Sequence, residues 1–291
     1  MKTDLSPVTP VNPPAPYLGG KRFLAPLICS RIAEVDHALY AEPFVGMGGV
    51  FFRRELRPDA EVINDRNGEV VNLFRILQRH YAAFMDHLKF QLTSRREFER
   101  LSRTDPSTLT DLERAARFLY LQRTAYGGKV QGQNFGVVPE RSARFDLSQV
   151  GPILEEIYER LTPVTIENLD WADLIARYDR PDTLFYLDPP YWGCETDYGK
   201  AVFAQDDFAR LAEQLGLPPR RLRKLISEAR EDGIAICGTP RDGYFMPVTA
   251  EELQQSCDFL ESRAMHSLRL LRTMRRTAMP TLAGQLLLSQ G

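Results

Sequence analysis

The run Asp188-Pro189-Pro190-Tyr191 combines a carboxylate, two rigid residues and an aromatic ring. It follows the apolar segment 184–187, which has the pattern of a buried strand, so Asp188 is expected at that strand's carboxyl end, where open α/β sheets bind ligands. Proline has a fixed φ and no N–H donor, which stiffens the loop and leaves carbonyl oxygens to accept hydrogen bonds. An exocyclic amine would suit this set, donating to Asp188 and to the Pro189 carbonyl with its ring on Tyr191. The alternative is a rigid turn with a capping aspartate.

A glycine-rich turn is the second candidate for chemistry. Gly46-Met47-Gly48-Gly49 follows the run Glu42-Pro43-Phe44-Val45 and precedes a segment with a helical pattern. Glycines here let the backbone approach a ligand, although the full GxGxxG spacing is absent and glycines in such turns are often structural. Asp65 ends the next expected strand, roughly 20 residues on, where this kind of fold binds ribose hydroxyls. A turn or helix-capping aspartate is the alternative.

Alternating strands and helices must position these residues. The pattern of apolar residues predicts a mostly parallel α/β sheet with helices on both faces. The expected strands are 38–41, 61–63, 164–166 and 183–187. The expected helices are 21–32, most of 69–103, and 112–123, and a loop rich in glycine and asparagine is expected over 126–145.

Composition sets limits on the class of protein. The 291 residues have room for one large α/β domain and a small module, and the net charge of −2 gives no global sign of a nucleic-acid partner. Any such contact would come from local basic stretches. The four cysteines form no CxxC pair, so neither a zinc site nor a disulfide framework is predicted. No segment approaches the about 20 apolar residues of a membrane span, and a soluble, cytoplasmic protein is expected.

Four segments in one order resemble the Dam-type (alpha-class) DNA adenine N6-methyltransferases. They are Tyr17-Leu18-Gly19-Gly20-Lys21, the run from Glu42 to Gly48, Asn64-Asp65, and the run from Asp188 to Tyr191. The resemblance covers about residues 15–208. It implies a Rossmann-like, S-adenosylmethionine-dependent methyltransferase sheet, with an inserted helical target-recognition region over about residues 71–146.

The resemblance also implies roles for individual residues. The positions that match the family's cofactor contacts are Tyr17, Gly20, Lys21, Phe44, Gly46, Gly48, Asp65 and Asp188. Tyr17 and Lys21 would contact the methionine end of the cofactor, and Asp65 the ribose. Asp188, Pro189, Pro190 and Tyr191 would hold an adenine flipped out of double-stranded DNA, as chemistry on a base requires. Its N6 would attack the sulfonium methyl group, and no metal is needed.

The recognition region offers candidate contacts to DNA. The segment 118–128 and Phe135-Gly136 resemble the corresponding region of the same family. The expected contacts to bases or phosphates are Arg123, Tyr126, Gly127, Lys129, Gln131 and Asn134. The alternative is that these residues are simply solvated, as polar loop residues usually are.

The chain departs from the family after about residue 205. Phe208, Leu211 and Leu215, followed by Gly216 and a basic segment that starts at proline, form a helix-turn-helix pattern. Segments 234–237 and 244–246 would form a two-stranded wing around a turn at 239–243. The expected DNA contacts are Arg220, Arg221, Arg223 and Lys224, and a solvated helix face is their alternative. In a competing interpretation, 234–237 is a further strand of the main sheet and 285–289 the closing one.

These patterns divide the chain into a disordered lead-in (1–16), a methyltransferase domain (17–205) and a winged helix-turn-helix module (206–291) with a helical tail. The expected function is site-specific methylation of adenine N6 in duplex DNA, of phage or prophage type. One alternative uses the same cofactor to methylate cytosine N4. Another is a non-catalytic DNA-binding regulator, made of a truncated methyltransferase and a winged helix.

Overall fold

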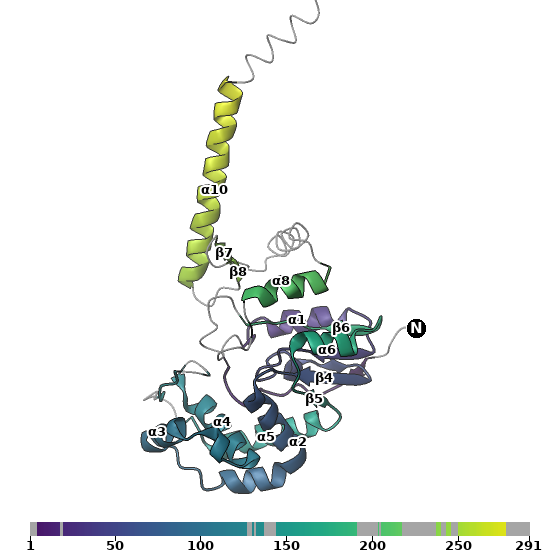
Figure 1. Ribbon diagram of the computed structural model, residues 1–291, viewed down its shortest axis with the longest axis vertical. Helices are drawn as coiled ribbons and strands as arrows, with labels where there is room; N and C mark the ends of the chain where they lie inside the picture. Colours follow the sequence, from purple (N-terminus) through teal and green to yellow (C-terminus); the bar gives the residue numbers. More distant parts are fainter. Residues whose placement is uncertain are drawn as a thin grey trace, which may run out of the picture. The chain divides into compact units, whose positions relative to one another are not determined.

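The computed structural model describes residues 5–17, 20–126, 130, 132–136, 144–190, 203, 205–216, 237–239, 243–245 and 250–277 (Figure 1). The chain divides into two compact units, Met1–Asp207 and Phe208–Gly291. The first unit contains the parallel sheet and every segment that resembles a methyltransferase.

Four parallel strands form the central sheet of the first unit, in the order β5-β4-β2-β6. They are β2 (Leu39–Glu42), β4 (Ala60–Asn64), β5 (Thr165–Glu167) and β6 (Thr183–Phe185). Leu39 of β2 lies opposite Ala60 on one side and Thr183 on the other. All four residues of β2 are buried, as expected of a strand that is paired on both sides. The predicted α/β class with a parallel sheet is confirmed.

The strand order creates a topological switch point between β2 and β6. The chain runs from β2 outward to β4 and β5, and then returns to the other side of β2 with β6. Connections that diverge in this way leave a crevice at the carboxyl ends of the strands, where ligands bind in open α/β sheets. Glu42 ends β2, Asp65 directly follows β4, and Asp188 lies shortly after β6. The sheet therefore brings three acidic residues to one edge.

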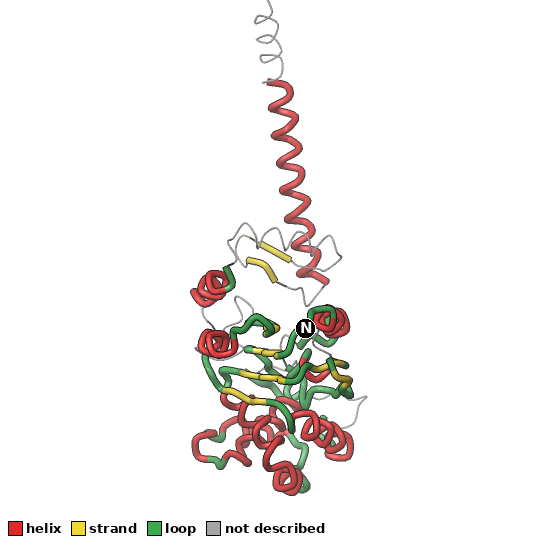
Figure 2. The backbone as a smooth tube through the Cα atoms, turned by 90° about the vertical axis from the view of Figure 1, so that its right-hand side faces the viewer, coloured by secondary structure: helices red, strands yellow, loops and turns green. Residues whose placement is uncertain are grey.

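Helices surround the strand layer of the first unit (Figure 2). They are α1 (Ala25–Ala33), α2 (Gly68–Leu88), α3 (Arg95–Arg103), α4 (Asp111–Thr124), α5 (Leu147–Leu161) and α6 (Trp171–Tyr178), with short 3-10 turns η1 (Phe51–Arg53) and η2 (Pro106–Thr108). Local capping explains where several begin: the side chain of Asn67 accepts the backbone N–H of Glu69 at the start of α2, and Thr110 and Glu113 form a capping box at α4. The predicted helical structure over 69–103 and 112–123 is confirmed.

Residues 5–16 of the proline-rich N-terminal segment pack against the domain, contrary to the disordered lead-in expected over 1–16. Strand β1 (Ser6–Pro7) pairs antiparallel with β3 (Leu56–Arg57), and the backbone N–H of Val11 donates to the carbonyl of Phe52 over 2.7 Å. Val11 and Ala15 are buried in the hydrophobic core. Prolines exclude a helix but allow extended backbone, which here docks through the remaining N–H groups and apolar side chains. This segment becomes part of the cavity wall described below.

A buried ion triad joins β4 to α5. Both oxygens of Glu61 accept hydrogen bonds from the guanidinium of Arg160, each over 2.6 Å, and Arg54 donates to Glu61 as well. The three side chains are each about 2% exposed. The Arg54 guanidinium also lies 3.7 Å from the centre of the Tyr40 ring, a cation–π contact with β2. Glu61 on β4 thus binds α5 through Arg160, and it binds Arg54, which contacts β2 through the Tyr40 ring.

The second unit contains a hairpin and a long helix among its described residues. Strand β7 (Cys237–Thr239) pairs antiparallel with β8 (Gly243–Phe245), and α10 spans Ala250–Thr277. Helix α8 (Gln205–Gln214) crosses the unit boundary and is followed by Gly216, whose φ of 58° does not continue a right-handed helix. Cys237 pairs with Phe245, so the described part of this strand belongs to the hairpin. The winged helix itself stays a prediction, because residues 217–236 and 278–291, with the basic run and the proposed closing strand, lie outside the described residues.

Two kinds of feature are absent from the described residues. No helix there is long and apolar enough to cross a membrane. No group of three or more His, Cys, Asp or Glu side chains there is arranged to hold a metal ion.

The substitution Glu61→Gln tests the buried triad. We expect it to lower the free energy of unfolding by about 3–5 kcal/mol, because two buried guanidinium groups lose their counter-charge. Urea unfolding followed by circular dichroism measures this change. The matched control is Asp86→Asn, in an exposed ion pair with Lys89, which should cost less than about 1 kcal/mol. Equal losses in the two variants would contradict a stabilising role for the triad.

Candidate active site

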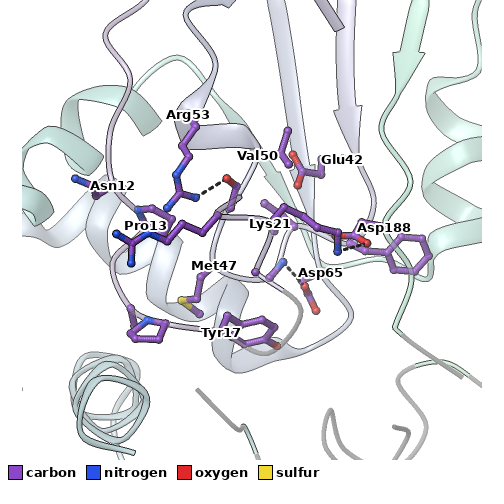
Figure 3. A pocket seen from close by; sticks show the side chains of 18 of the residues that line it. Asn12, Pro13, Tyr17, Lys21, Glu42, Met47, Val50, Arg53, Asp65 and Asp188 are labelled. Atoms are coloured by element: carbon purple, nitrogen blue, oxygen red, sulfur yellow. Dashed lines mark hydrogen bonds and ion pairs between the residues drawn. The ribbon is translucent and has the colours of Figure 1, made fainter. Parts of the chain in front are cut away.

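A cavity of about 520 Å³ opens at the switch point (Figure 3). Its volume lies within the range of about 300–1,000 Å³ that is typical of small-molecule sites. The walls come from residues within 12–22 and 42–53, from Asp65 and Arg123, and from residues 188–190. Segments far apart in the sequence therefore meet at the edge where the parallel strands end.

An ion pair between Lys21 and Asp188 spans the cavity wall. The ammonium Nζ lies 2.7 Å from Oδ1 and 2.6 Å from Oδ2 of the carboxylate. Burial raises the pKa of Asp188, and the charge and hydrogen bond of Lys21 oppose that rise. Lys21, predicted to contact the methionine end of a cofactor, thus holds the predicted catalytic carboxylate.

The glycine loop and Asp65 form one structural unit. The backbone N–H of Gly46 donates to Oδ2 of Asp65 over 2.9 Å, and that of Asn67 donates to Oδ1 over 2.8 Å. Gly46 and Gly48 have φ values of 51° and 72°, and a Cβ at either position would press on the ring of Tyr17 or Phe52. These positions require glycine. Burial raises the pKa of Asp65 to about 6, despite the two N–H groups that favour its ionised form.

Most residues predicted to bind the cofactor or the target amine meet in this cavity. Those that line it are Tyr17, Gly20, Lys21, Phe44, Gly46, Asp65, Asp188, Pro189 and Pro190. Gly48 lies in the same loop and packs against Phe52. Tyr191 lies outside the described residues. The structure thus brings these residues together, and their contacts with a cofactor or a base stay predictions.

Sequence reasoning missed several residues of the wall. Glu42 is 2% exposed, lines the cavity and accepts a hydrogen bond from the Tyr40 hydroxyl over 2.7 Å. Burial raises the pKa of Glu42 to about 8. Its place shortly before the glycine turn was a usable signal, because an acid at the end of a central strand lies at the ligand edge. The N-terminal residues 12–16 carried no such signal, because only tertiary packing brings them to the site.

Arg123, a predicted DNA contact, has its guanidinium bonded within the protein, and its contact with DNA stays a prediction. It lines the cavity, and its Nη1 donates to the carbonyl of Pro14 over 2.6 Å. Burial lowers the pKa of this guanidinium. Arg123 therefore fastens the N-terminal segment to α4, a role that is not visible in a sequence where residues 14 and 123 are so far apart.

Two other predicted DNA contacts lie together on the surface. The Tyr126 backbone N–H donates to the carbonyl of Asn134 over 2.9 Å, next to an antiparallel bridge between Ala125 and Phe135. The Tyr126 side chain is 72% exposed, and Asn134 is exposed as well. The remaining candidates of this loop, Gly127, Lys129 and Gln131, lie outside the described residues.

The substitution Glu42→Gln tests the burial of this acid through its pH dependence. The carboxyl ionises near pH 4.5 when unfolded and near pH 8 when folded, so between these values only the unfolded state releases the proton. Wild-type stability should therefore fall as pH rises, relative to the non-titrating variant. The unfolding free energy of wild type minus that of the variant should fall by up to about 1.4 kcal/mol per pH unit and level off above about pH 8. Urea unfolding at a series of pH values measures this difference, and a value independent of pH would contradict the raised pKa.

The sequence of this chain is similar to those of known proteins. A family model described as D12 class N6 adenine-specific DNA methyltransferase matches residues 17–216. Type II methyltransferase M.CviBI of Paramecium bursaria Chlorella virus NC1A is 26% identical over 179 residues, which cover 61% of this chain and 68% of the relative. Type II methyltransferase M1.LlaDCHI of Lactococcus lactis subsp. cremoris is 29% identical over 220 residues, or 70% and 75%. The DNA N-6-adenine-methyltransferase of Escherichia phage P1 is 28% identical over 229 residues, or 76% and 28%.

The matched region contains all four sequence segments that resembled this family and the described residues of the cavity wall from Tyr17 onward. It spans more than half of the chain and ends before the hairpin and long helix of the second unit. The resemblance inferred from those segments is confirmed, and this chain belongs to the D12 class N6 adenine-specific DNA methyltransferases.

Proposed function

We propose that this chain transfers the methyl group of S-adenosylmethionine to N6 of an adenine flipped out of duplex DNA at a specific site. The observation that carries the proposal is the Lys21–Asp188 ion pair, which lies in a cavity at the switch point with Pro189 and the glycine loop in the same walls. Family membership supplies the reaction, and the cavity supplies residues suited to perform it.

The residues of the cavity fit S-adenosylmethionine, which joins an amino acid to a nucleoside through a sulfonium. Gly46 lets backbone form the wall directly. Each Asp65 oxygen accepts one backbone N–H and retains a lone pair for a ribose hydroxyl. Acidic and basic side chains near the loop suit the two charges of an amino acid. When bound, the cofactor supplies an electrophilic methyl group.

Asp188 and Pro189 are the proposed acceptors for the target amine. An aromatic amine is a poor nucleophile because its lone pair is delocalised into the ring. Hydrogen bonds from both N–H groups to these acceptors favour tetrahedral geometry at N6 and counter its developing positive charge. Lys21 favours the ionised form of Asp188, so that its oxygens accept rather than donate. Holding both reactants in one cavity contributes the orientation.

The loop around Tyr126 and Asn134 is the proposed contact to DNA in the recognition region. Tyr126 offers an exposed aromatic ring, and every base has a face on which such a ring stacks. Asn134 offers an exposed amide that can bond to a base edge or a phosphate. We further propose that Arg220, Arg221, Arg223 and Lys224, which lie outside the described residues, contact phosphates from a winged-helix module.

The substitution Asp188→Asn tests the proposed acceptor. Incubation with duplex DNA and S-adenosylmethionine labelled in its methyl group should label adenine N6, and the variant should lose about 100-fold or more of the rate, because a neutral amide is a weaker acceptor for the charged transition state. The control is Asp182→Asn, at an exposed position outside the cavity wall.

The same assay separates the alternatives. Equal rates in wild type and Asp188→Asn would refute the site. Label on cytosine would instead establish an N4 methyltransferase. DNA binding by wild type without any methyl transfer would establish the non-catalytic regulator.

The substitution Tyr126→Ala tests the loop. Loss of base stacking should weaken binding to a duplex by roughly 5- to 100-fold, from the 1–3 kcal/mol typical of such a stack. Fluorescence anisotropy with a labelled duplex at fixed salt measures the affinity. The control is Tyr158→Ala, which removes a ring that stacks on Tyr81 between α2 and α5. An unchanged affinity in Tyr126→Ala would remove this ring from the DNA interface.

A further inference from the structure

Arg53 lies over the glycine loop in the cavity wall (Figure 3). It ends the η1 turn that directly follows the loop, and its Nη1 donates to the carbonyl of Gly49 over 2.6 Å. A Cβ built on Gly49 would lie 3.9 Å from this Nη1 and 3.4 Å from the backbone N of Lys21. The loop, the start of the Lys21 segment and the Arg53 guanidinium thus meet at one end of the cavity.

Arg53 has no carboxylate within ion-pair distance among the residues that the structure describes, and the same is true there of Arg22. Burial lowers the pKa of Arg53, and the charge of Arg22 lowers it further. Both arginines line the cavity. Arg53 is half-buried and Arg22 is exposed beside it, and an anion bound near the two guanidinium groups would favour their charged forms.

The other charged groups of the cavity already have partners. The Lys21 ammonium is paired with Asp188, and the Arg123 guanidinium donates to a backbone carbonyl. On the acidic side, Asp65 accepts two backbone N–H groups. Figure 3 shows Arg53 on a different side of the cavity from Glu42 and Asp188. Among the residues that the structure describes, Arg53 and Arg22 thus place two positive charges without a carboxylate partner in the cavity wall.

We propose that Arg53, assisted by Arg22, binds the carboxylate at the methionine end of S-adenosylmethionine. This inference rests on the proposed function. A guanidinium matches a carboxylate with paired N–H donors, and the bond to Gly49 occupies only part of the Arg53 donor set. That bond also holds the side chain in place, so little conformational entropy is lost when the carboxylate binds.

The test compares two ligands that differ only in the carboxylate. Isothermal titration calorimetry measures the affinity of S-adenosylmethionine and of decarboxylated S-adenosylmethionine for wild type, Arg53→Gln, Arg53→Lys and the control Arg79→Gln, at an exposed position on α2. We expect Arg53→Gln to lower the affinity for S-adenosylmethionine by about 10- to 100-fold, as for a lost charge-assisted hydrogen bond. Binding of the decarboxylated ligand should be unchanged, Arg53→Lys should restore part of the loss, and the control should match wild type.

Other outcomes overturn the inference in distinguishable ways. If Arg53→Gln lowered the affinity for both ligands equally, Arg53 would only shape the glycine loop. Unchanged affinity for S-adenosylmethionine would show that another group holds the carboxylate. Failure of wild type to bind either ligand would overturn the proposed function itself. Thermal unfolding of Arg53→Gln at the wild-type temperature shows that the variant is folded.

Discussion

The parallel pairing of β2 with both β4 and β6 is the constraint on which the site depends. Parallel strands end at the same edge of the sheet. The strand order reverses beside β2, and this reversal leaves a crevice at that edge. Glu42, Asp65 and Asp188 reach this crevice only because their strands are neighbours in this order. An antiparallel β6 would place Asp188 at the opposite edge. The chemistry of the family is therefore built on strand order as much as on residue type.

Two kinds of interaction balance charge at the crevice: an ion pair between side chains, and hydrogen bonds from backbone N–H groups to a carboxylate. Lys21 and Asp188 neutralise each other where the target amine would be held, and backbone N–H groups stabilise Asp65 beneath the loop. Burial raises the pKa of Glu42, Asp65 and Asp188, so each carboxyl depends on its neighbours for ionisation. A ligand that carries both charges of an amino acid complements such a site, because it supplies counter-charges without water.

The core behind the sheet is linked to the site through Tyr40. The Arg54 guanidinium, held by Glu61, lies against the Tyr40 ring, and the Tyr40 hydroxyl donates to Glu42 in the cavity wall. A buried ion pair adds little net stability over an apolar replacement, but removing one partner leaves an uncompensated buried charge. Glu61 therefore keeps the Arg54 guanidinium beside Tyr40, on the strand that ends at Glu42.

The sequence alone determined the α/β class, the edge at which Asp188 lies and the glycine loop, because strand patterns, proline and glycine act locally. It also determined the family, through segments whose order needs no structure. Only the tertiary structure decided which partners those residues have. Arg123 donates to the carbonyl of Pro14, residues 5–16 pack against the core although a disordered lead-in was expected, and Lys21 meets Asp188. The Arg123–Pro14 and Lys21–Asp188 contacts join residues 109 and 167 positions apart, and no local pattern encodes which distant surface a side chain will meet.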